Sequence, residues 1–249
     1  MSVWLSKQDI INSESICIFA DSSYRENYMD VKGITCPAIC VTCNGTIIDQ
    51  KYSLEYNSTS QRGELYALAM AVHESIKYRN YKYIRIFSDS LNGILALRER
   101  VFKWIERANA GLEYYDPAPN TLGAKNEDLI MSTIYNITMN NIPLELFHVK
   151  GHVNYSQYGS LMHAKRVFSH SNGITVPIDT ELIRILSIFN DMVDRYSTFN
   201  LNKHIEDQFY KSKLTDAISI GYNNNFNYSA YHNLLILPED RYNKYGRRE

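Results

Sequence analysis

The 249-residue chain is long enough for one sizeable domain with an appendage, or for two small domains. Its 45% hydrophobic and 21% charged residues are typical of a globular protein, and its formal net charge of -1 excludes a basic character spread over the whole chain. Any nucleic-acid binding must therefore come from a local basic patch, or from metal ions that neutralise an acidic site.

The start of the chain does not have the pattern of a signal peptide. The first residues, MSVWLSKQDI, lack the charged region followed by an apolar region that marks a signal peptide. No apolar run approaches the roughly 20 residues needed to span a bilayer. We expect a soluble, cytoplasmic protein in a reducing compartment, with no membrane partner.

The first part of the chain predicts three strands and a helix. Residues 15–21 form an apolar run that ends in an acid, and 36–43 and 46–56 read as two strands around the hairpin signal Asn44-Gly45. Residues 61–78 then change to helical spacing, with Ser60 available as the N-cap.

Three of the four cysteines, Cys36, Cys40 and Cys43, crowd the second of these strands, and Cys17 lies in the first. Structural zinc needs four closed ligands, and strand alternation points Cys43 away from Cys36 and Cys40. We therefore interpret the cysteines as buried strand residues.

The next part alternates strands with helices. The expected elements are a strand over 83–88, a helix over about 91–100, a helical piece with Trp104, a loop over 111–123, a helix over 126–139 and a strand over 142–149. Residues 153–180 read as polar and irregular, with Gly159, Gly173 and Pro177 as breakers, and a helix resumes over about 181–198.

This order predicts an α/β fold with a five-stranded mixed sheet, three antiparallel strands followed by parallel ones, flanked by helices. We expect an N-terminal extension over 1–14, a catalytic domain over 15–200 with an insertion at about 153–180, and a C-terminal extension over 201–249.

Four acids stand where carboxylates are costly or well placed for ligands. Asp21 and Asp89 follow apolar strands, Glu64 shares a helix face with Leu68 and Val72, and Asp194 lies in the last helix. Each alone is more often a cap or a helix-end charge. Gathered at one sheet edge they would repel one another, and a divalent cation such as magnesium or manganese is the natural compensation.

Several short segments resemble the signature of the type 1 ribonuclease H family. They are FADSS (19–23), TSQRGELYAL (59–68), FSDS (87–90), HVKGH (148–152) and NDMVD (190–194). The similarity also extends through VFKWIERANAG and NEDLIMSTI, and it covers roughly residues 15–152 and 185–200 in the right order.

The resemblance implies a role for each matching residue. Asp21, Glu64, Asp89 and Asp194 would be the metal-binding catalytic carboxylates, and His152 the auxiliary histidine. The residues that would touch or orient the substrate are Thr59, Ser60, Gln61, Asn190 and Trp104. For His152 the alternative is a surface loop histidine, and for Trp104 a core tryptophan.

The implied activity is two-metal hydrolysis of the RNA strand of RNA–DNA hybrids, with two Mg²⁺ ions (or Mn²⁺) and 5′-phosphate products. One alternative keeps the fold with a DNA substrate, as in resolvase- or integrase-like nucleases. Another is a hybrid-binding module whose site has lapsed.

The chain also departs from the family pattern. Ser22 replaces a common glycine, and only Gly33 remains of the usual glycine-rich turn. Between His152 and Asn190 lie 37 residues where the family has a few, which leaves Asp179 and Asp191 as alternatives to Asp194. The insertion carries cationic or titratable residues that could form a positive surface: His163, Lys165, Arg166 and His170.

Overall fold

The computed structural model describes residues 5–28, 31–98, 126–140, 142 and 144–223, with side chains as far as 213. The chain divides into two compact units, Met1–Asn202 and Lys203–Glu249. The expected helical piece with Trp104 and the loop over 111–123 lie outside the described residues.

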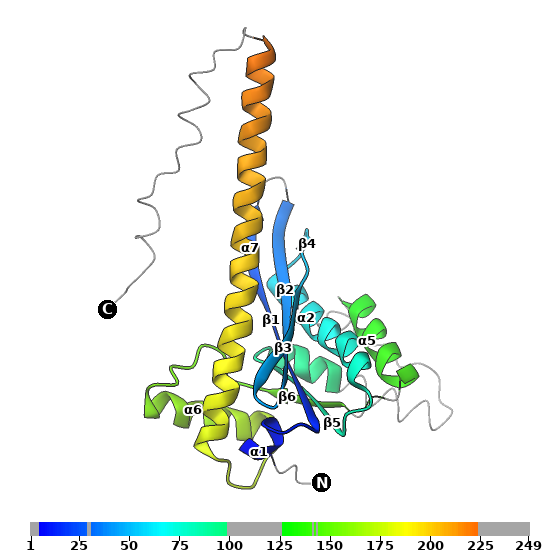
Figure 1. Ribbon diagram of the computed structural model, residues 1–249, viewed down its shortest axis with the longest axis vertical. Coiled ribbons are helices and arrows are strands. Elements are labelled where there is room, and N and C mark those ends of the chain that lie inside the picture. The colour runs from blue at the N-terminus through cyan, green and yellow to red at the C-terminus, as the bar shows by residue number, and fades with distance from the viewer. Residues whose placement is uncertain (1–4, 29–30, 99–125, 141, 143, 224–249) are drawn as a thin grey trace. The chain divides into compact units, whose positions relative to one another are not determined.

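The first unit is built on a mixed sheet in the strand order β3-β2-β1-β5-β6, with the short β4 paired to β2 (Figure 1). The strands are β1 (Ser15–Tyr28), β2 (Val31–Cys43), β3 (Thr46–Tyr52), β4 (Glu55–Tyr56), β5 (Tyr83–Ser88) and β6 (Leu144–His148). β1, β2 and β3 are antiparallel neighbours, whereas β1, β5 and β6 run parallel. The mixed α/β sheet is therefore confirmed, with β4 as an additional strand.

The helices are α1 (Lys7–Ile10), α2 (Ser60–Ser75), η1 (Ile76–Tyr78), a helix over 91–98, α5 (Glu127–Asn140), α6 (Tyr158–Ser171) and α7 (Thr180–Asn223). α7 begins in the first unit and continues into the second. No helix in the described part of the chain combines the length and the apolar character that crossing a membrane requires.

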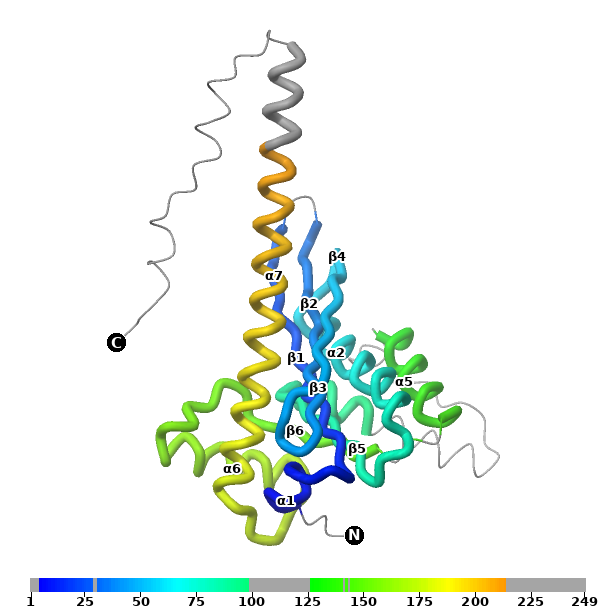
Figure 2. Tube along the Cα trace, in the orientation of Figure 1, coloured from blue at the N-terminus to red at the C-terminus, as the bar shows by residue number. Residues whose placement is uncertain are grey.

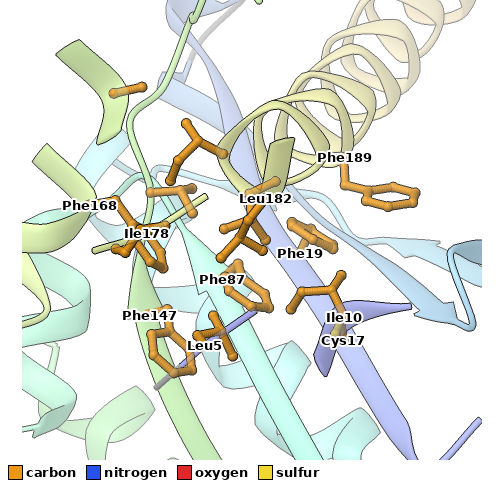
Figure 3. Packing of buried hydrophobic residues seen from close by; sticks show 14 of the residues in the cluster. Leu5, Ile10, Cys17, Phe19, Phe87, Phe147, Phe168, Ile178, Leu182 and Phe189 are labelled. Carbon is orange, nitrogen blue, oxygen red and sulfur yellow. The ribbon is translucent and has the colours of Figure 1, made fainter. Parts of the chain in front are cut away.

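Two hydrophobic cores lie on opposite faces of the sheet. Strand residues that point to one face pack against α6 and the start of α7, and Figure 3 shows Phe19, Phe87 and Phe147 beside Phe168 and Leu182. Alternate strand residues face the other way and pack against α2, α5 and the helix over 91–98. The period-2 alternation of the strands thus divides the side chains between two helical layers.

The hairpin between β2 and β3 turns at Asn44-Gly45, as the sequence predicts. Both residues have positive φ, 49° and 72°, as the tight turn requires. Cys17, Cys36 and Cys40 are buried free thiols and Cys43 is partly buried, which fits strand residues.

Three expectations about the elements were wrong. β1 does not end at Asp21 but continues for seven residues, and β1 and β2 form an extended hairpin up to the pair Tyr28–Val31 (Figure 2). Residues 153–180 contain the helix α6, because Leu161, Ala164 and Phe168 give it an apolar face, while Gly159 lies exposed in its first turn. Ser60 is the first residue of α2 and not its N-cap.

Candidate active site

Asp21 lies inside β1, two residues beyond the last parallel pair with β5, Phe19–Phe87. Its side chain is 9% exposed, and its Oδ1 accepts a 2.6 Å hydrogen bond from the Ser22 amide. Gly63 explains how α2 approaches this point, because a Cβ there would overlap the Ser22 hydroxyl and Thr35. The missing side chain therefore lets the helix pack closely beside the first acid.

Glu64 lies one turn into α2, whose N-terminus is capped by Thr59. The Thr59 hydroxyl accepts a hydrogen bond from the Arg62 amide at 3.2 Å, which fixes where the helix begins. Ser90 donates to Oε2 of Glu64 at 2.6 Å, and the Ser60 hydroxyl lies 3.5 Å from Oε1. These hydroxyls offset the cost of a carboxylate on the inner face of the helix.

Asp89 follows the last residue of β5 and is contacted by an amide side chain and by a closely passing loop. Asn190 on α7 donates to its Oδ2 at 3.4 Å. The loop after β6 passes so close that a Cβ on Gly151 would overlap the Asp89 carboxylate. Only a glycine fits at that point of the loop.

Asp194 is brought to the site by a hydrogen-bonded contact between α7 and the β1–β2 hairpin. Ser197 is fully buried; its hydroxyl accepts from the Ser23 amide at 2.6 Å and donates to the Cys36 carbonyl at 2.5 Å. The neighbouring Thr198 hydroxyl lies 2.7 Å from that of Ser23. These bonds hold the turn of α7 that carries Asp194 against β1, next to Asp21.

His152 lies in the loop that leaves β6 and has a positive φ of 50°, a conformation uncommon for a residue other than glycine. Its ring is exposed, with Nδ1 3.7 Å from Oδ2 of Asp194. The loop therefore presents an imidazole at the edge of the acid group.

The four acids and His152 all line one cavity of about 520 Å³. Burial raises the pKa of Asp21 well above its ordinary value, and the charges of Asp89, Asp194 and Glu64 raise it further. Burial also raises the pKa of Asp89; Asn190 and His152 lower it, while Glu64 and Asp194 raise it. Their mutual repulsion shows that the cavity concentrates negative charge.

The side chains of the cavity are of the type that binds a hard divalent cation, but their present positions do not form a metal site. Carboxylate oxygens around one cavity are the ligands that magnesium and manganese favour. Within the described residues, however, no group of three or more His, Cys, Asp or Glu side chains is placed to hold a metal ion as it stands. Asp21, Glu64 and Asp89 each accept a hydrogen bond from a neighbour, which orients the three carboxylates and leaves further lone pairs for a cation.

The other expected residues fall into three positions. Ser60 lines the cavity, whereas Thr59 and Gln61 are exposed at the start of α2 outside its lining. Asn190 is 2% exposed, with Nδ2 toward Asp89 and with an Oδ1 that has no hydrogen-bond partner among the described residues. Trp104 lies outside the described residues.

The alternatives to Asp194 lie elsewhere. Asp191 pairs with Arg195 at 2.9 Å, one turn along α7. Asp179 accepts a hydrogen bond from the Glu181 amide at the start of that helix, at 3.0 Å. Neither residue lines the cavity, so Asp194 alone of the three joins the other acids.

Sequence reasoning missed several lining residues, which include Ser23, Tyr24, Arg25, Thr198 and Asn202. Among the described residues that line the cavity, Arg25 is the only lysine or arginine, and it lies there because β1 continues past Asp21. Ser197 was the available signal for this contact between α7 and the β1–β2 hairpin. It is a polar residue on the buried face of α7, one turn after the core residue Val193.

A family model described as RNase H matches residues 13–160. The chain belongs to the RNase H family, whose enzymes generally use divalent metal ions. The match includes Asp21, Glu64, Asp89 and His152 and ends before Asp194. No curated protein matches the chain.

Solved structures of related folds are similar at low identity. The chain is 16% identical to Prototype Foamy Virus protease-reverse transcriptase, with 70% of this chain and 23% of that chain covered and a TM-score of 0.45. The PFV RNase H domain is 14% identical over 66% of this chain and 96% of that chain, with a TM-score of 0.44. LC9-RNase H1, a type 1 RNase H, is 16% identical over 65% and 74%, with a TM-score of 0.42. This chain thus spans less than a quarter of the foamy virus protein.

Proposed function

We propose that this protein is an endonuclease that hydrolyses the RNA strand of RNA–DNA hybrids with the help of divalent metal ions. The observation that carries the proposal is the convergence of Asp21, Glu64, Asp89 and Asp194 on one cavity, within a chain of the RNase H family. They come from β1, α2, the end of β5 and α7, so only the fold assembles them.

Different polar side chains orient the acids through hydrogen bonds, as a site with a fixed geometry requires. Ser90 orients Glu64, Asn190 orients Asp89, and Ser197 fixes the helix turn of Asp194. We assign His152, exposed at the rim, to moving a proton or assisting product release. Ser60, in the cavity lining, is placed to meet the substrate, and Thr59 and Gln61 flank it.

We assign Mg²⁺ to the acid cavity, held by the four carboxylates. Two bound ions would supply activation of the attacking water and stabilisation of the leaving 3′ oxygen. The protein's part is to bring the carboxylates together in a buried cavity, where burial and then the neighbouring negative charges raise the pKa of Asp21 and Asp89. The products would carry a 5′-phosphate and a 3′-hydroxyl.

A cleavage assay with one end-labelled strand tests the proposal. The strand is presented as RNA–DNA hybrid, duplex RNA and duplex DNA, each with Mg²⁺ and with EDTA. We expect metal-dependent cutting of the RNA strand in the hybrid alone. Cutting of duplex DNA would replace the proposal with a DNA nuclease, and tight hybrid binding without cutting would indicate a lapsed site.

A further inference from the structure

The segment between β6 and α7 has a single acidic residue, Asp179, which lies directly before α7. From Gly151 to Ile178 there is no Asp or Glu, although the whole chain has a net charge of -1. The same segment contains Lys165, Arg166, His163 and His170, all on α6. A positive potential therefore gathers on this helix, whereas the charge of the whole chain nearly cancels.

The cations border a groove. A cavity of about 500 Å³ runs along α6 and the residues after it. Its lining combines basic, hydroxyl-bearing and apolar residues: Lys165, Arg166, His170, Ser169, Thr175, Met162, Gly173 and Ile174. The described structure gives neither Lys165 nor Arg166 an acidic partner within 4.0 Å, unlike Arg62 and Arg85, which are paired with carboxylates. Two unpaired cations beside two hydroxyls form a surface that suits phosphate oxygens.

The helix that borders the groove is anchored by its opposite, buried face. Leu161, Ala164 and Phe168 are buried in the core that also contains Phe147 and Leu182, and Figure 3 shows Phe168 inside that core. Because this face is fixed, the outward cations are displayed on a rigid helix rather than on a loop.

The C-terminal end of α6 is also fastened to the sheet edge that carries the acids. Asn172 accepts from the His148 amide at 2.9 Å and donates to the His148 carbonyl at 2.7 Å. The Arg98 guanidinium donates to Asn172 and to the Ser171 carbonyl. His148 is paired in register with Ser88, the residue before Asp89, so α6 ends at the same sheet edge as the acid cavity.

We propose that the α6 groove binds the phosphate backbone of the nucleic-acid duplex whose RNA strand lies in the acid cavity. This inference rests on the proposed function, because it takes the hybrid as the ligand. A duplex carries phosphates well beyond the bond that is cut, so a second contact surface at the same sheet edge would hold the flanking helix. It would contribute affinity without sequence preference, because phosphate contacts carry no base information.

The test compares Lys165→Gln/Arg166→Gln with a control, Arg79→Gln/Lys82→Gln, which removes the same charge between η1 and β5. Hybrid binding is measured by fluorescence anisotropy in EDTA, where no cleavage occurs, over a series of salt concentrations. For the α6 variant we expect roughly ten-fold weaker binding at low salt, and a log–log salt slope reduced by about 0.9 per lost contact. The control variant should match the wild type.

Hybrid length gives a second measurement. A duplex of about two helical turns should show the defect, whereas one of about one turn, roughly 10 base pairs, should bind wild type and variant more nearly alike.

Both variants should keep the wild-type melting temperature, because the substituted side chains point away from the cores. Unchanged affinity and salt slope in the α6 variant, or in Lys165→Glu/Arg166→Glu, would overturn the inference. If the wild type does not cleave the hybrid, the proposed function itself is contradicted.

Discussion

Asp89 contacts both the last helix of the site and the loop that carries His152. It accepts a hydrogen bond from Asn190, approaches Gly151, and carries a pKa raised by burial and by the charges of Glu64 and Asp194. Replacement by asparagine keeps the size of the side chain and removes one negative charge from the cavity.

We predict that Asp89→Asn abolishes cleavage of the hybrid, by at least roughly 100-fold, while hybrid binding is retained. The reason is the loss of a metal-binding charge at an unchanged shape. Asp191→Asn is the matched control on α7, since Asp191 pairs with Arg195 outside the cavity. Cleavage by Asp89→Asn at the wild-type rate would remove this residue from the site.

Arg25 provides the second residue-scale prediction. It is exposed and lines the acid cavity, where a cation can meet a substrate phosphate before the acids repel it. We expect Arg25→Gln to raise KM for the hybrid several-fold and to lower the salt slope by about 0.9, with little change in kcat. Arg25→Lys should retain most of the affinity; an equal loss in both variants would argue against a role for charge.

At the scale of the element, the junction of α6 with β6 shows how the insertion is tied to the site. His148, the last residue of β6, is 7% exposed, and its Nδ1 lies 2.8 Å from the Ser171 hydroxyl. Burial is the main cause that lowers the pKa of His148. The folded protein therefore favours a neutral imidazole at this junction.

This burial has a consequence for stability. As the pH falls through about 6.5, the unfolded chain takes up a proton at His148 that the folded protein resists, so the free energy of unfolding falls. We predict that this fall, between about pH 7.5 and pH 5.5, is smaller in His148→Gln. Chemical denaturation at several pH values measures the difference, because the contributions of other groups largely cancel between the two proteins. Parallel curves for both would contradict the assignment.

At the scale of the whole molecule, the acid cavity joins distant parts of the sequence, so a cation there should stabilise the complete fold. We predict that Mg²⁺ at about 100 times its dissociation constant raises the free energy of unfolding by about 2.7 kcal/mol, seen as a higher melting temperature than in EDTA. Asp89→Asn should lose most of the shift, and Asp191→Asn should keep it. Equal melting temperatures of the wild type in Mg²⁺ and EDTA would count against a metal site.

Much of the first unit could be predicted from the sequence because its signals are local. The apolar runs of β5 and β6, the Asn44-Gly45 turn and the helical spacing of α2 each lie within a few residues. The buried strand alternation also predicted that the cysteines face the cores. α6 was missed because exposed glycine and polar residues obscured an apolar stripe of only a few positions.

The strand–helix order and the candidate acids Asp21, Glu64 and Asp89 follow from the sequence alone, since a carboxylate on an apolar helix face or beside an apolar strand can be recognised without the fold. The packed fold places Asp194, rather than Asp191, in the cavity with Asp21, because this placement depends on hydrogen bonds of the buried Ser197 to residues 161 and 174 positions away in the chain. The structure also placed Arg25 at the cavity and fastened α6 to the end of β6. Such contacts between segments far apart in sequence leave no local periodicity, so the packed fold alone defines them.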